Sequence, residues 1–224
     1  MGPTPVAQFA RIRRRGITMT STSMPLALSA TRSSSVLSQI LLVLVASALL
    51  TVSAKIQVPF WPVPMTMQSY VVLVLGMALG PRLGPAAVAV YLAQGALGLP
   101  VFAGTPEKGI GLAYMIGPTG GYLLGFLMAA VVTGQCAARG FDRTWPQAFL
   151  TALAGMAVLY ACGLLWLGWL FGVEKAIQFG LTPFILGAFV KILLAMATLP
   201  LAWKLLGRHQ HRAAKDTAPR SDND

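Results

Sequence analysis

Long apolar runs alternate with short polar and glycine- or proline-rich segments along most of this chain. A helix rises about 1.5 Å per residue, so about 20 apolar residues cross the hydrocarbon core of a bilayer. Some of the runs are shorter than this and require tilt or local thinning of the bilayer. The pattern predicts an all-α integral membrane protein with six transmembrane helices, at about residues 36–54, 66–80, 84–99, 115–137, 147–171 and 182–206.

The two ends of the chain differ from this apolar centre. Residues 1–33 are rich in Arg, Ser, Thr and Pro, and residues 208–224 are polar. The first segment contains no apolar stretch followed by a cleavage site, so it does not resemble a signal peptide. We expect a disordered basic cytoplasmic extension over 1–33, a six-helix membrane domain over 34–207 and a polar cytoplasmic tail over 208–224.

Composition and charge placement support this interpretation. The 224 residues are 56% hydrophobic and 10% charged, whereas a soluble domain has about 25% charged residues. Thirteen of the seventeen Lys and Arg residues fall on the side of the predicted membrane that holds both termini. Basic residues concentrate on the cytoplasmic side, so both termini are predicted to be cytoplasmic. The net charge of +11 is therefore interpreted as setting the orientation of the helices in the membrane. Membrane lipid is an expected partner, and no nucleic-acid partner is predicted.

Two segments on the predicted outer side are not ordinary short turns. Residues 55–65 contain three prolines and two aromatic residues, and residues 99–114 contain three glycines and two prolines. Irregular backbone cannot face lipid, because its amides would lack hydrogen-bond partners. These segments are therefore either a lid over a cavity or stiff connectors at the surface.

Lys191 stands alone within the last apolar run. A lysine at the centre of a membrane helix costs about 2.5–3.5 kcal/mol on insertion scales unless something compensates its charge. No acidic residue lies in any apolar run, so the missing partner suggests an anion brought from outside, such as a substrate carboxylate. The acidic residues are Glu107, Asp142, Glu174, Asp216, Asp222 and Asp224.

Few other polar side chains could carry chemistry. Gln68, Tyr91 and Gln94 lie in the second and third runs, and a buried amide must bond either a ligand or a neighbouring helix. His209 and His211 are in the tail, and no nucleotide-binding glycine motif or catalytic pair occurs within a run. Cys136 and Cys162 are expected to be small core residues. The chain is therefore not expected to be an enzyme or to hold a cofactor.

Five sequence segments stand out in the chain, namely PVPMTMQ, GPRLG, YLAQGALGLPVFAG, GPTGGYLLGF and TPFILGAFVK. Together they resemble the BioY family, the biotin-specific substrate-binding (S) subunits of energy-coupling-factor (ECF) transporters. The resemblance spans about residues 36–206. It implies an S-component fold with a biotin site near the outer face, in the bacterial cytoplasmic membrane. It also implies a transmembrane coupling protein and two cytoplasmic ATPase subunits as partners.

The resemblance also suggests which residues contact biotin, namely Gln68, Gln94 with Tyr91, the VFAG loop out to Lys108, and Lys191. One position departs from the family. The last helix usually carries a Gly-Asp pair followed three residues later by Lys, but here Ala188 follows Gly187. Two alternatives stay open, an S subunit for another vitamin and, from a different class, a membrane enzyme or protease. Uptake of biotin is the predicted function.

Overall fold

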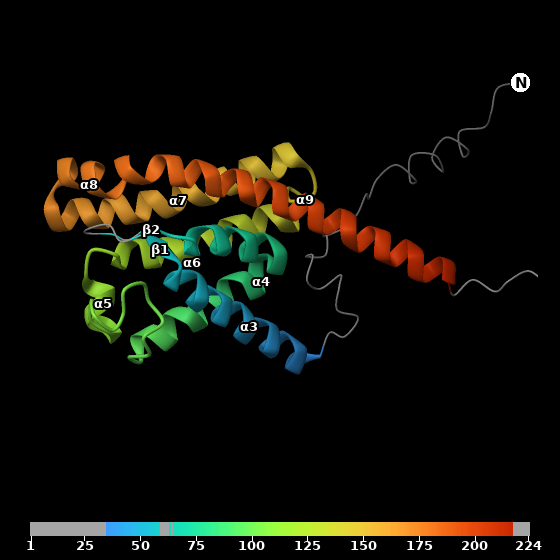
Figure 1. The fold of residues 1–224 in the computed structure, drawn as a ribbon, viewed down its shortest axis with the longest axis horizontal. Helices are drawn as coiled ribbons and strands as arrows, with labels where there is room; N and C mark the ends of the chain where they lie inside the picture. Colours follow the sequence, from blue (N-terminus) through green and yellow to red (C-terminus); the bar gives the residue numbers. More distant parts are fainter. Residues whose placement is uncertain (1–34, 59–62, 64, 217–224) are drawn as a thin grey trace, which may run out of the picture.

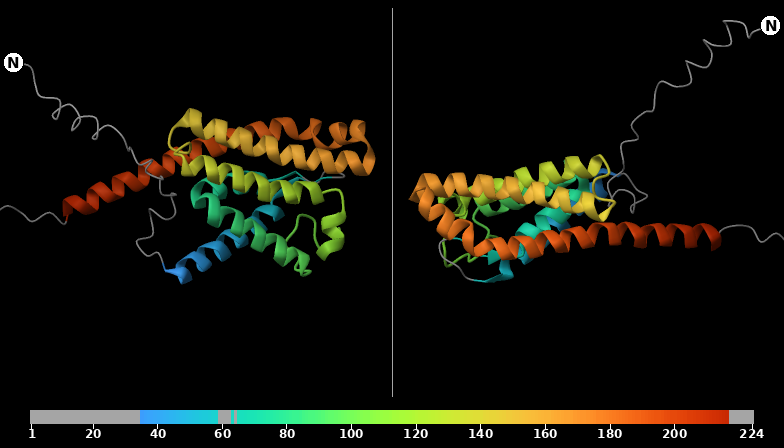
Figure 2. Two further views of the ribbon diagram at one scale, coloured as in Figure 1. Left: turned by 180° about the vertical axis from the view of Figure 1, so that it is seen from behind. Right: turned by 90° about the horizontal axis from the view of Figure 1, so that it is seen from above.

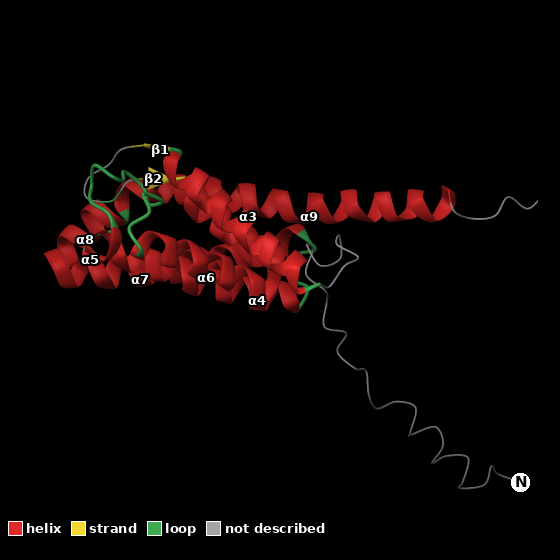
Figure 3. Cartoon of the chain, turned by 90° about the horizontal axis from the view of Figure 1, so that it is seen from below, coloured by secondary structure: helices red, strands yellow, loops and turns green. Residues whose placement is uncertain are grey.

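The computed structural model describes residues 35–58, 63 and 65–216. Helices make up most of this part of the chain (Figures 1 and 3). They are α3 (Val36–Lys55), α4 (Gln68–Ala96), α5 (Gly111–Ile116), α6 (Gly120–Ala138), α7 (Trp145–Phe171), α8 (Val173–Gly180), the 3-10 helix η1 (Thr182–Phe184) and α9 (Ile185–Asp216). Two short strands, β1 (Gln57–Val58) and β2 (Met65–Thr66), pair in antiparallel register.

Five helical stretches in the described part of the chain are long and apolar enough to cross a membrane. They are Val36–Lys55, Gln68–Ala96, Gly120–Ala138, Trp145–Phe171 and Val173–Leu205. This agrees with the prediction of an all-α protein with several membrane-spanning helices. The second and third predicted runs both fall within α4.

The backbone of α4 breaks at Gly80, which has φ 76° and ψ −171° and is followed by Pro81. Glycine adopts positive φ without the steric cost that a side chain would bring. A Cβ added to Gly84 would lie only 3.0 Å from the Cα of Gly76, although eight residues of straight helix would separate these positions by about 12 Å. The two halves of α4 therefore fold back against each other (Figures 1 and 2).

Close helix contacts rest on glycine at several positions. A Cβ on Gly134 of α6 would lie 2.8–2.9 Å from backbone atoms of Gly80 and Pro81. A Cβ on Gly125 would lie 2.7 Å from the backbone oxygen of Leu159 in α7. In a bilayer no hydrophobic force drives helices together, so helix association depends on close packing, which small residues allow. The core of α4, α6 and α7 is built in this way, and α9 packs against α7 and α4, while α3 lies at the edge beside α4.

The two ends of the bundle carry different elements (Figure 1). The start of α3, the break in α4 and the α6–α7 loop gather at one end, whereas β1, β2, α5 and α8 gather at the other. α9 runs past the first end to Asp216, beyond residue 207 where the membrane domain was expected to stop. The predicted extension over 1–33 and the last residues of the predicted tail lie outside the described residues.

The loop between α6 and α7 contains a buried acid. Asp142 is 1% exposed, and its Oδ2 accepts a 2.7 Å hydrogen bond from Nε1 of Trp203 on α9. The guanidinium of Arg143 lies 5.0 Å from the centre of the Trp203 ring. Burial raises the pKa of the Asp142 carboxyl, while the Trp203 hydrogen bond acts in the opposite direction. Asp142 is thus in a loop, as expected, but it fastens that loop to α9.

The predicted outer segments adopt different structures. Residues 59–62 and 64 of the first segment lie outside the described residues, and its ends form β1 and β2. The second segment follows α4 as a chain of turns and ends in α5, which residues 117–119 separate from α6. The two alternatives for these segments, a lid over a cavity or stiff connectors at the surface, stay predictions.

Candidate functional site

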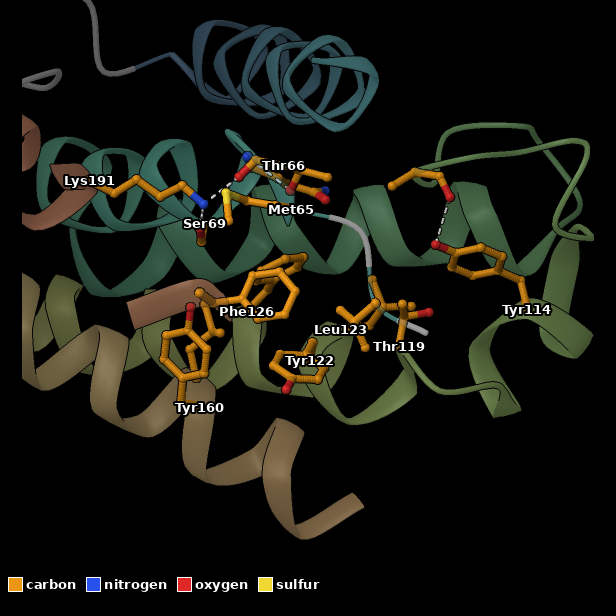
Figure 4. A pocket seen from close by; sticks show the side chains of 15 residues that line it. Met65, Thr66, Ser69, Tyr114, Thr119, Tyr122, Leu123, Phe126, Tyr160 and Lys191 are labelled. Carbon is orange, nitrogen blue, oxygen red and sulfur yellow. Dashed lines mark hydrogen bonds between the residues drawn. The ribbon is translucent and has the colours of Figure 1, made fainter. Parts of the chain in front are cut away.

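A cavity lies toward the end of the bundle that carries β2, α5 and α8. Its empty volume is about 560 Å³, part of which is open to solvent. Residues from the start of α4, the first half of α6, the second half of α7 and the start of α9 form its walls (Figure 4). The lining residues are Val63, Met65, Thr66, Gln68, Ser69, Ala103, Tyr114, Thr119, Tyr122, Leu123, Phe126, Leu159, Tyr160, Phe184 and Lys191.

Lys191 supplies the one cationic group on this list. Its side chain is 7% exposed, and Nζ donates hydrogen bonds to Thr66 O at 2.6 Å and to Ser69 Oγ at 3.1 Å (Figure 4). A lysine ammonium has three donors, so these two bonds leave one for a ligand. Within the described residues, no carboxylate forms an ion pair with Lys191. Ala188, one turn earlier on α9, is buried and provides no acid.

Gln68 places an unsatisfied donor at the same cavity. The residue is 2% exposed, and its Nε2 makes no hydrogen bond of good geometry among the described residues, although the Tyr91 hydroxyl lies close enough to interact with its side chain. A buried donor without a partner costs about 1–3 kcal/mol relative to a satisfied one. A hydrogen bond holds its backbone at the start of α4, since the Gln68 N–H donates to Thr66 Oγ1 at 3.3 Å. An acceptor on a bound ligand would remove this cost.

The opposite wall of the cavity is aromatic. The rings of Tyr122 and Tyr160 meet edge to face with their centroids 6.2 Å apart, and Phe126 lies beside them (Figure 4). The Tyr122 hydroxyl donates to Gly180 O at 2.8 Å, which holds it away from ligand bonding. A Cβ on Gly163 of α7 would lie 2.4 Å from the Tyr122 ring, so this ring rests directly on the α7 backbone. The wall is thus rigid and presents mainly apolar surface.

The other candidates named from the sequence lie outside the cavity lining. Tyr91 is fully buried, and its hydroxyl donates to Val101 O at 3.2 Å. Gln94 Oε1 accepts a 2.8 Å hydrogen bond from Ser47 Oγ on α3, so this glutamine bonds a neighbouring helix, the alternative left open by the sequence. Lys108 is exposed on the loop after α4, where its stem packs against Gly104. Of that set, only Lys191 and Gln68 line the cavity.

Several lining residues were not singled out by the sequence. Thr66 lies within the PVPMTMQ segment and Ser69 directly follows it, while Thr119 and Tyr122 belong to the GPTGGYLLGF segment. The clustering of such segments could have pointed to them. Tyr160 lies in an otherwise uniform apolar run and carries no comparable signal.

Fold and cavity together define a class of protein. Small-molecule sites are concave, mostly apolar, and contain a few well-placed polar groups, and this cavity combines an aromatic wall with Lys191 and Gln68. In the part of the chain that the structure describes, no group of three or more His, Cys, Asp or Glu side chains could hold a metal ion. The molecule is a multi-pass membrane protein with a cavity whose composition is typical of small-molecule sites.

The chain belongs to the BioY family, whose sequence model matches residues 20–208. It is 42% identical over 144 residues to a probable biotin transporter BioY of Pyrococcus horikoshii, covering 64% of this chain and 83% of that protein. It is 39% identical over 150 residues to the biotin transporter BioY of Thermotoga maritima, covering 66% of this chain and 86% of the relative. These relatives are transporters and not enzymes, which confirms that part of the sequence-based prediction.

A solved structure shares the fold. The crystal structure of the S-component for biotin from an ECF-type ABC transporter aligns with a TM-score of 0.61. The alignment covers 75% of this chain and 92% of the other, at 23% sequence identity. The predicted S-component fold is therefore present.

Proposed function

We propose that this protein captures biotin in the cavity beside Lys191 and passes it across the membrane. Biotin combines an apolar bicyclic ring and aliphatic chain with a ureido group and a terminal carboxylate. An aromatic wall suits the ring, a buried ammonium without a protein counter-ion suits the carboxylate, and an unpaired amide donor suits a second acceptor. The observation that carries the proposal is the position of Lys191 and Gln68 on one cavity in a member of the BioY family.

In the proposed topology, the chain crosses the membrane six times and both termini lie in the cytoplasm. Each half of α4 counts as one crossing, because Gly80 reverses the chain direction. Arg82 follows the break in α4, and Arg139 and Arg143 lie between α6 and α7, so these residues belong to the end of the bundle from which α9 projects. Lys55 ends α3 and Lys175 lies on α8, toward the other end. This charge asymmetry supports a cytoplasmic position for the first end. The cavity then opens toward the outer face of a bacterial cytoplasmic membrane.

Transport is proposed to be energised by a transmembrane ECF coupling protein and two cytoplasmic ATPase subunits. The resemblance of the fold to an ECF S-component supports this. The lipid-exposed or partner-exposed surface is large on α3, whose side chains Leu37, Leu44 and Val52 are all exposed. Transport of biotin into proteoliposomes that contain this protein, with and without the coupling protein and ATPases, tests the proposal. Saturable biotin uptake that requires ATP and all subunits supports it, and absence of biotin binding to the purified protein contradicts it.

Replacing Gln68 with Met should weaken biotin binding about three- to tenfold. The substitution keeps the length of the side chain but removes the amide donor, and a neutral hydrogen bond contributes about 0.5–1.5 kcal/mol. Equilibrium binding of labelled biotin to the purified protein measures the change. The matched control is Gln94→Met, which removes an amide that bonds Ser47 outside the cavity and should change affinity less than twofold. Equal losses in the two variants would remove Gln68 from the site.

A further inference from the structure

Lys55, at the outer end of α3, holds the loop that follows α4. Its Nζ donates to Phe102 O at 3.0 Å, to Thr105 O at 3.1 Å and to Thr105 Oγ1 at 3.1 Å. All three donors of the ammonium are thereby used. The same turn is closed from within, since Thr105 Oγ1 donates to Phe102 O at 2.7 Å. We call residues 101–109 the clasped loop.

The clasped loop forms part of the cavity wall. Ala103 lines the cavity, and its backbone oxygen accepts a 2.8 Å hydrogen bond from the hydroxyl of Tyr114, which also lines it (Figure 4). The Phe102 ring stacks on Tyr114 with centroids 4.9 Å apart. The position of Tyr114 at the cavity therefore depends on where the backbone of residues 102–105 sits.

The other side of the clasped loop rests on α4. Phe102 is fully buried and meets the Tyr91 ring edge to face with centroids 5.5 Å apart. A Cβ on Gly95 would lie 2.0 Å from the Phe102 ring, so the ring sits directly on the α4 backbone. Tyr91 in turn donates its hydroxyl proton to Val101 O. Lys55 adds a further anchor from α3, through its bonds to Phe102 O and to Thr105.

We propose that Lys55 is a positioning residue for the binding cavity, acting through the clasped loop on Ala103 and Tyr114. That the cavity binds biotin rests on the proposed function, but the role of Lys55 in holding the clasped loop does not. A compact ammonium with three donors satisfies converging carbonyl and hydroxyl oxygens, which a planar guanidinium matches less well. Loss of Lys55 frees the outer turn of the loop while leaving the Phe102 ring in its socket. The cavity wall then loosens without unfolding of the bundle.

The first arm of the test needs no ligand. Hydrogen–deuterium exchange of the intact protein is measured over residues 99–110 for wild type, Lys55→Met, Lys55→Arg and Lys175→Met. The amides of Lys108 and Gly109 bond Gly104 O and Pro106 O, so they report the integrity of the loop. We expect at least tenfold faster exchange in Lys55→Met, only partial recovery in Lys55→Arg and no change in Lys175→Met, which removes an exposed lysine of α8. Unchanged exchange in Lys55→Met overturns the proposal.

The second arm measures biotin affinity and dissociation rate in the same proteins. Lys55→Met should bind three- to tenfold more weakly, mainly through faster dissociation, with the thermal midpoint of the ligand-free protein close to that of wild type. Thr105→Val, which removes one acceptor of the Lys55 ammonium, should shift affinity in the same direction by a smaller factor. Faster loop exchange with unchanged biotin affinity would overturn the positioning role. If wild type binds no biotin at all, the proposed function fails, while the exchange data still decide whether Lys55 holds the loop.

Discussion

Replacing Lys191 with Met is expected to weaken biotin binding about 10–100-fold. Methionine keeps an unbranched side chain of similar length but removes the charge and every donor. A hydrogen bond to a charged group contributes about 1.5–3 kcal/mol, and 1.4 kcal/mol corresponds to a tenfold change in affinity. Because no protein carboxylate in the described residues pairs with this ammonium, the ligand is its proposed counter-ion. Isothermal titration of the purified protein with biotin measures the effect.

The matched control for this experiment is Lys204→Met on the same helix. Lys204 is exposed near the far end of the bundle, so its replacement should leave biotin affinity unchanged. Lys191→Met also loses the bonds to Thr66 and Ser69, and a thermal midpoint measured without ligand separates that structural contribution from ligand contact. Full affinity in Lys191→Met would show that Lys191 does not hold the ligand.

Replacing Gly134 with Ala is expected to destabilise the protein by about 1–3 kcal/mol, the usual cost of overpacking. The new Cβ would meet Gly80 and Pro81 at 2.8–2.9 Å, and all the atoms it meets belong to backbone. These atoms form the break of α4, so they cannot rotate aside as a flexible side chain would. Either α6 moves away from α4 or the chain reversal at Gly80 opens.

Thermal unfolding in detergent, followed by circular dichroism, measures this destabilisation. Gly168→Ala in α7 is the control, because the nearest atom to its added Cβ lies 3.9 Å away. Alanine also favours a helix by about 1 kcal/mol relative to glycine, so Gly168→Ala should match or exceed the wild-type midpoint. Identical midpoints for the two variants would mean that the contact between α6 and the α4 break carries no packing constraint.

The apolar pattern predicted the membrane class and the approximate extent of most helices, because hydrocarbon enforces long uninterrupted runs of apolar residues. It predicted less about how helices end. The pattern placed two separate runs at 66–80 and 84–99, and both fall within α4, where the dihedral angles of Gly80 mark the reversal of the chain just before Pro81. Sequence also placed the fourth run from 115, whereas α6 begins at Gly120 after the short α5.

Residues of the candidate site were predictable where a polar side chain stands within an otherwise apolar run. Lys191 and Gln68 are polar groups in apolar runs, and both reach the cavity. Gln94 is also a polar group in an apolar run, yet it bonds Ser47, because a buried amide is satisfied equally well by a ligand or by a neighbouring helix. Tyr160 is an ordinary residue for a membrane helix. Only the rotation of α7 about its own axis turns it toward the cavity, and that rotation depends on contacts such as Gly163 with Tyr122.

The length of α9 has a consequence for whatever meets the protein on its far side. Its 32 residues correspond to about 48 Å at 1.5 Å per residue, whereas the hydrocarbon core is about 30 Å thick. With moderate tilt, the helix leaves the bilayer while still wound and continues as a stalk through the headgroups and into water. A stalk of this kind is a rigid spacer, unlike an unstructured tail. It fixes the direction of the chain and its distance from the membrane surface at the end of α9.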